Sequence, residues 1–199
     1  MAHASIAVNV DSTVHQQHLA IAEAGKILAI KGDHDGALQH YREAISIVVS
    51  LKAPEIFFRH YTQCVLESLE LSGAHEQVIE YCEKADTHYA SIETANFLTR
   101  RDQCELWERL GINLLKSGDN IAAVEQLNRA VSGSPSGKRP ISEQLLTWLQ
   151  RYPSLDVHRI ETLQRRHDYF TVRKDRLDKN RAEFLNLNKP RKQPMDMTI

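Results

Sequence analysis

Glycine and proline are scarce in this sequence, with 8 and 6 residues among 199. They stand at a few separated sites, which is typical of long helices joined by short turns. Apolar residues make up 42% of the chain and charged residues 26%, so both a hydrophobic core and a solvated surface are expected. The composition therefore predicts an all-α domain or a small array of helical repeats.

Cysteine is also scarce, since only Cys64, Cys82 and Cys104 occur. Their odd number and wide spacing fit neither a disulfide framework nor a zinc knuckle, so buried reduced thiols are expected. No apolar run approaches the roughly 20 residues that a membrane-spanning helix needs. The first ten residues lack the basic start and apolar stretch of a secretory signal. We therefore predict a cytoplasmic protein without a membrane span.

Charge is unevenly distributed along the chain. Residues 1–157 carry 14 basic and 20 acidic side chains, whereas residues 158–199 carry 11 basic and 6 acidic ones. An acidic body therefore precedes a basic C-terminal arm. The arm suggests an alternative function, a protein associated with nucleic acid. Because acidic residues alternate with the basic ones, as on a solvated helix face, nucleic acid is the less favoured partner.

A repeat pattern is clearest between Trp107 and Pro135. Large and small residues recur there at the spacing of the tetratricopeptide signature: Trp107, Leu110, Gly111, Leu114, Gly118, Ala123, Leu127, Ala130 and Pro135. This segment resembles the tetratricopeptide-repeat family, and two earlier segments fit the same frame less completely. The turn glycines Gly32, Gly73 and Gly118 are 41 and 45 residues apart, so the repeats are longer than the family's usual period of about 34.

The resemblance implies an all-α solenoid of about three helical hairpins over residues 14–135, after a flexible N-terminus at 1–13. The expected helices are 14–31, 35–51, 54–72, 75–90, 92–117 and 120–133. A polar linker and a capping helix are predicted over 136–152, because the last repeat would otherwise expose its core. One long helix over 153–187 and a disordered basic tail at 188–199 complete the prediction.

The predicted C-terminal helix carries one apolar stripe, because large residues recur at every seventh position. They are Leu163, Phe170, Leu177 and Phe184. We predict that this stripe contacts another surface. Two possibilities remain open from the sequence: packing on the chain's own repeats, or contact with a partner or with a second copy of the chain.

No residue pattern predicts catalysis. His15 and His18 stand one helical turn apart, but no third metal ligand lies at a useful spacing. Residues 133–139 resemble a phosphate-binding loop only faintly, since they are one residue short and follow no predicted strand. We therefore predict that the protein is not an enzyme and has neither a cofactor nor a metal site.

The resemblance implies a protein-binding scaffold, adaptor or assembly factor that holds a peptide or helix of a partner. The expected site is the concave face formed by the first helix of each hairpin. Its predicted residues are Lys26, Ile30, Gln63, Glu67, Glu70, Glu105, Glu108, Arg109 and Ile112. We expect the glutamates at 67, 70 and 108 to lie on exposed helix surface. The acidic bias of this face favours a basic or amphipathic partner segment.

Some members of the family grip the terminal carboxylate of a peptide with basic and amide side chains. The matching positions here are Ala22, Lys26, Cys64, Glu105 and Arg109, and of these only Arg109 fits. Glu105 has the opposite charge to the family's residue. The resemblance therefore implies a repeat scaffold without that carboxylate clamp.

Overall fold

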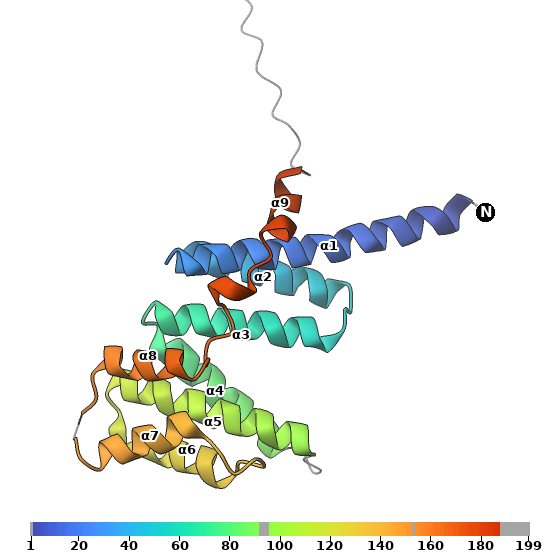
Figure 1. Ribbon diagram of the computed structural model, residues 1–199. Coiled ribbons are helices and arrows are strands. Elements are labelled where there is room, and N and C mark those ends of the chain that lie inside the picture. Colours follow the sequence, from blue (N-terminus) through green and yellow to red (C-terminus); the bar gives the residue numbers. More distant parts are fainter. Residues whose placement is uncertain (1, 92–95, 153, 188–199) are drawn as a thin grey trace, which may run out of the picture. The chain divides into compact units, whose positions relative to one another are not determined.

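The computed structural model describes residues 2–91, 96–152 and 154–187, with side chains from 13 to 183 in these ranges. The described residues form helices and no strand (Figure 1), which confirms the all-α prediction. In chain order the elements are α1 (Ala2–Ile30), α2 (His34–Ser50), α3 (Glu55–Leu71), α4 (His75–Ala90), α5 (Phe97–Ser117), α6 (Asn120–Ser132), α7 (Pro140–Leu149), α8 (Val157–Arg166), the 3-10 helix η1 (Lys174–Arg176) and α9 (Lys179–Leu187).

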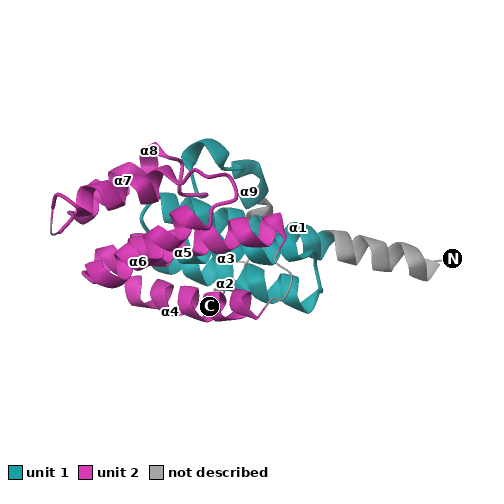
Figure 2. Cartoon of the chain, turned by 90° about the horizontal axis from the view of Figure 1, so that it is seen from below, with its two compact units in different colours: residues 1–68, 172–199 teal, residues 69–171 magenta. Residues whose placement is uncertain are grey.

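The chain divides into two compact units (Figure 2). Unit 1 comprises residues 1–68 and 172–199, and unit 2 comprises residues 69–171. The boundary falls within α3, so this helix gives its first turns to unit 1 and its last turn to unit 2. None of the helices in the described residues is both long enough and apolar enough to cross a membrane.

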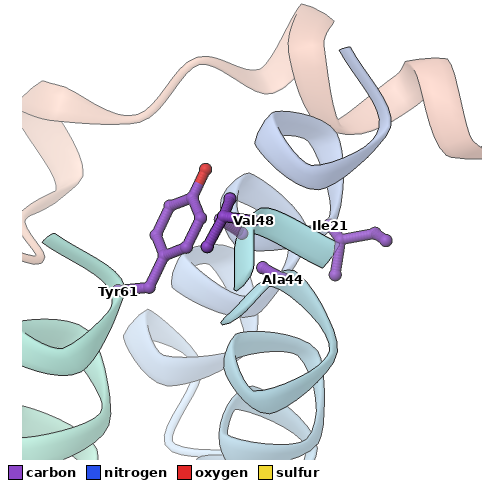
Figure 3. Packing of buried hydrophobic residues seen from close by; sticks show 5 residues of the cluster. Ile21, Ala44, Val48 and Tyr61 are labelled. Carbon is purple, nitrogen blue, oxygen red and sulfur yellow. The ribbon is translucent and has the colours of Figure 1, made fainter. Parts of the chain in front are cut away.

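In unit 1, α1 packs against α2, and α9 also contacts α1. One core cluster joins α1 and α2 to α3 through Ile21, Ala44, Val48 and Tyr61 (Figure 3). The α1–α2 contact is close at Gly25, where an added Cβ atom would lie 2.7 Å from the ring of Tyr41. Gly25 therefore lies where α1 and α2 approach closely.

In unit 2, α5 packs against both α4 and α6, and α7 follows on α6. Leu110, Leu114 and Leu127 are buried between these helices. Trp107 is only partly buried. Its indole N–H donates to a carboxylate oxygen of Asp86 at 2.8 Å, and the Arg129 guanidinium lies 4.3 Å from the centre of its ring.

Two of the turns that join paired helices share the same local structure. Gly32 and Gly118 adopt φ angles of +85° and +96°, a region that favours glycine. Each is followed by an aspartate whose side chain accepts a backbone hydrogen bond at the start of the next helix, from Gly36 at 2.9 Å for Asp33 and from Ala122 at 3.0 Å for Asp119. Gly73 has a φ of +82°, but the following Ala74 offers no side-chain cap. The middle turn is therefore the weakest copy.

The predicted single helix over 153–187 is wrong, because the structure has α8, η1 and α9 in its place. α8 ends at Arg166, and Asp168 adopts a left-handed φ of +53°. The Tyr169 backbone N–H then donates to the Gln164 carbonyl at 3.0 Å and closes the helix end. Leu163 lies in α8, Phe170 follows the turn, and Leu177 lies between η1 and α9, so they do not form one helical stripe. The side chain of Phe184 lies outside the described residues.

Two predictions at the chain ends have different outcomes. α1 begins at Ala2, well before the predicted helix start at residue 14. No glycine or proline occurs before Gly25, so no breaker residue opposes this longer helix. The flexibility predicted for residues 1–13 stays a prediction. The disordered tail predicted for residues 188–199 lies outside the described residues.

Enlarging Gly111 should destabilise unit 2. An added Cβ atom would lie 2.8 Å from Cγ of Leu127 and 3.2 Å from the Ala123 carbonyl oxygen. We expect Gly111→Leu to lower the free energy of unfolding by roughly 1–3 kcal/mol through overpacking. Chemical denaturation followed by circular dichroism measures the change. Glu125→Leu adds the same side chain to an exposed position of α6 and should change stability little. Equal stability of the two variants would contradict the α5–α6 packing.

Candidate functional site: the buried Glu70 cluster

Unit 2 contains a buried group of charged and hydrogen-bonding side chains. We name it the Glu70 cluster, and its members are Glu70, Arg109, Lys116, Gln164 and Tyr169. The last turn of α3 supplies the glutamate, which is 1% exposed. α5 supplies the two cations, and the chain at and after the end of α8 supplies the amide and the phenol. Elements far apart in the sequence therefore meet at one carboxylate.

The Glu70 carboxylate accepts hydrogen bonds from three side chains. Lys116 Nζ donates to Oε1 at 2.9 Å, and Gln164 Nε2 donates to the same oxygen at 2.6 Å. The Tyr169 hydroxyl donates to Oε2 at 3.1 Å. Both oxygens are therefore used, and two of the three donors come from the C-terminal part of unit 2.

The charge on Glu70 is maintained in spite of its burial. Burial alone would raise the pKa of this carboxyl group. The Lys116 and Arg109 cations lower the pKa, as do the hydrogen bonds from Lys116 and Gln164, and the net result is a pKa below the ordinary value. Glu70 therefore remains an anion at neutral pH and acts as an acceptor.

The phenol of Tyr169 lies between a cation and an anion. Arg109 places its guanidinium 5.2 Å from the centre of the Tyr169 ring, while the hydroxyl faces Glu70. Burial raises the pKa of Tyr169 well above its ordinary value. The hydroxyl therefore keeps its proton and serves as a donor.

Glu108, in the same unit, binds the start of α7. Its Oε2 atom accepts hydrogen bonds from the Ser142 hydroxyl at 2.6 Å and from the Ser142 backbone N–H at 3.3 Å. Arg139 lies 3.8 Å from its other oxygen. Because Ser142 lies in the first turn of α7, Glu108 caps that helix from α5.

A related contact occurs within unit 1. Glu67 is buried, and its carboxylate accepts the backbone N–H of Val172 at 2.9 Å. The Val172 side chain packs against the buried cluster of Ala37, Tyr41 and Cys64. The segment after α8 is thus held by a glutamate in this unit as well.

The expectation that Glu67, Glu70 and Glu108 lie on exposed helix surface is wrong, since all three are buried. Arg109 and Ile112 are buried too, whereas Glu105 is exposed and Lys26, Ile30 and Gln63 are partly exposed. The spacing did not indicate which segments cover these residues. Lys116, Gln164 and Tyr169 were not predicted as part of a site. Lys116 is seven residues after Arg109 on α5, so helical spacing could have indicated it.

Unit 1 contains a second polar group, formed by two histidines and a tyrosine. His18 is fully buried; its Nδ1 lies 2.8 Å from the Tyr61 hydroxyl and its Nε2 lies 3.0 Å from Nδ1 of His15. Burial, with a smaller contribution from His15, lowers the pKa of His18 to about 4. No group of three or more metal-ligating side chains occurs among the described residues. His18 is therefore neutral at physiological pH and part of the core.

Comparison of the chain with protein-family models, with curated proteins and with solved structures gives no match.

Replacing Lys116 should destabilise the protein, because it leaves a buried negative charge unpaired. In the Glu70–Lys116 pair both side chains are fully buried, so Lys116→Met leaves an anion without its nearest cation. We expect the free energy of unfolding to fall by roughly 3–5 kcal/mol, as for other broken buried pairs. Urea denaturation measures the loss. The control, Lys84→Met, breaks a solvent-exposed ion pair with Glu80 and should have no measurable effect. A loss no larger than that of the control would contradict the buried pair.

Acid should destabilise the fold through His18. Its pKa is about 4 in the folded protein and about 6.5 when unfolded, so the unfolded chain takes up the proton first as pH falls. Stability contributed by the neutral ring is complete above pH 6.5 and declines towards pH 4, by up to about 1.4 kcal/mol per pH unit. Urea denaturation at several pH values measures this slope. His18→Gln should reduce the slope, whereas the exposed control His158→Gln should not. An unchanged slope in His18→Gln would contradict this assignment.

Proposed function

We propose that this protein is a protein-binding scaffold or adaptor built from tetratricopeptide-like helical hairpins, and that unit 2 holds a segment of a partner protein. The observation that carries the proposal is the contact of residues 164–170 with Glu70 of α3 and Arg109 of α5. Side chains of α3 and α5 bind this segment although it is distant in the sequence. Glu70 and Gln164, for example, are 94 residues apart. A face that binds a distant segment of its own chain has the chemistry to bind a similar segment of another chain.

The repeated turns support the hairpin part of the proposal. The left-handed glycine and the capping aspartate recur at Gly32–Asp33 and at Gly118–Asp119. Each unit contains one copy of this turn, which supports a repeated hairpin frame. In this proposal the partner contacts α5 in unit 2, where Glu105 is the exposed member of the predicted face.

The basic C-terminal arm gives less support to nucleic-acid binding. Three of its arginines lie near carboxylates of the arm itself, at 3.0 Å for Arg165 with Glu161, 3.5 Å for Arg181 with Asp178 and 3.7 Å for Arg173 with Asp175. Phosphate contacts would have to compete with these carboxylates. Protein binding is therefore the preferred function.

Partner capture tests this proposal. Tagged full-length protein is incubated with native lysate, and the bound proteins are identified by mass spectrometry. The variant Glu105→Arg reverses an exposed charge on the proposed face, so we expect the specifically captured protein to fall at least about fivefold while helicity is kept. Glu125→Arg reverses an exposed charge on α6 and serves as the control. Equal capture by both variants, or no protein captured above the empty resin, would contradict the proposal.

A further inference from the structure

Resting on the proposed function, we propose that residues 163–170 are an internal stand-in for the partner, and that the partner presents the same chemistry. The required segment is a helix end that offers a glutamine and, five residues later, a tyrosine followed by a large apolar residue. In this chain these are Gln164, Tyr169 and Phe170.

The first requirement is a pair of uncharged donors. Glu70 already receives the cationic donor Lys116 from the face itself, while the covering segment adds an amide at 2.6 Å and a phenol at 3.1 Å. A carboxylate at either position would face the buried anion and be repelled. The Glu70 cluster thus selects neutral donors, which agrees with the absence of a carboxylate clamp from the sequence pattern.

The second requirement is an interrupted helix. Successive residues of an α-helix are rotated by about 100°, so residues five apart on a continuous helix point about 140° away from each other. Gln164 and Tyr169 could not both reach one carboxylate in that case. The left-handed turn at Asp168 brings the tyrosine back to the same side. The partner must therefore end its helix between the two donors.

The third requirement is an apolar anchor on each side of the polar contacts. Ile160 and Leu163 are buried before the helix end, and Phe170 is buried after it. The intervening residues 165–168 are exposed. The segment therefore has one recognised side, and its basic exposed side is free to vary in a partner.

The stand-in is held imperfectly, so another segment can replace it. The Gln164 Oε1 atom is buried and has no hydrogen-bond partner among the described residues. A buried amide oxygen without a partner weakens the contact. Attachment to the same chain compensates, because a tether gives the segment an effective concentration in the millimolar range. A partner with a better-satisfied side chain at this position would compete successfully.

Fluorescence anisotropy with a labelled peptide of residues 157–173 tests the inference. The proteins are the full-length chain and its Gln164→Ala/Tyr169→Phe variant, in which the internal segment is weakened. We expect the peptide to bind the variant at least about tenfold more tightly, because the tethered competitor is less effective. A peptide carrying the same two substitutions should bind the variant at least about tenfold more weakly than the unaltered peptide. Arg165→Ala/Arg166→Ala, which alters only exposed residues of the segment, is the matched control and should bind like the wild type.

The stand-in would be overturned if the peptide bound wild type and variant equally. It would also be overturned if the altered and unaltered peptides bound the variant equally. Circular dichroism and thermal melting check that the variant is folded. If it is not, the single Tyr169→Phe change removes one hydroxyl and should still increase peptide binding about threefold; no increase would overturn the inference. If peptide binding does not change but Glu105→Arg clearly reduces capture from lysate, the stand-in is rejected and the protein-binding function is retained. Peptide binding without that loss would reject the proposed function.

Discussion

The anion at Glu70 is the constraint on which the rest of unit 2 depends. An ionised carboxylate with no exposed side-chain area is tolerated only when cations and hydrogen-bond donors replace water. α5 provides the charge through Lys116, but a single ammonium group does not use both oxygens. Gln164 and Tyr169 complete the set, so the chain after α7 must return to α3 and α5. A local electrostatic need thus determines the course of a distant segment.

The same need explains why α8 is short. A continuous helix through residue 170 would satisfy its own backbone, and residues 154–187 contain no glycine or proline that would stop it. Ending the helix at Arg166 costs a left-handed residue, Asp168, but it lets the Tyr169 hydroxyl reach Glu70 and buries Phe170. Strain at one residue is compatible with a gain in hydrogen bonding to a charged acceptor. Tertiary contacts therefore override helix propensity here.

This balance also shows what the sequence can and cannot predict. The hairpin turns were predictable, because Gly118 and Asp119 act on their immediate neighbours, and the buried Leu110 and Leu127 follow helical spacing. The end of α8 was not, because its cause lies outside the local pattern. A seven-residue spacing of apolar residues is equally consistent with a helix and with a helix followed by a turn. The burial of the predicted face was not foreseen for the same reason, since the sequence of the covering segment suggested a separate basic arm.

The character of the contact bears on how a partner would be recognised. Apolar burial is favourable but not directional, so a segment bound only by Leu163 and Phe170 could shift in register. Hydrogen bonds have strict distance and angle requirements, and two donors on one carboxylate define both register and orientation. A slipped segment would leave a buried anion short of donors, which is more costly than losing one hydrogen bond in water. In the proposed partner contact, Glu70 would therefore contribute selectivity, and the surrounding apolar side chains would contribute affinity.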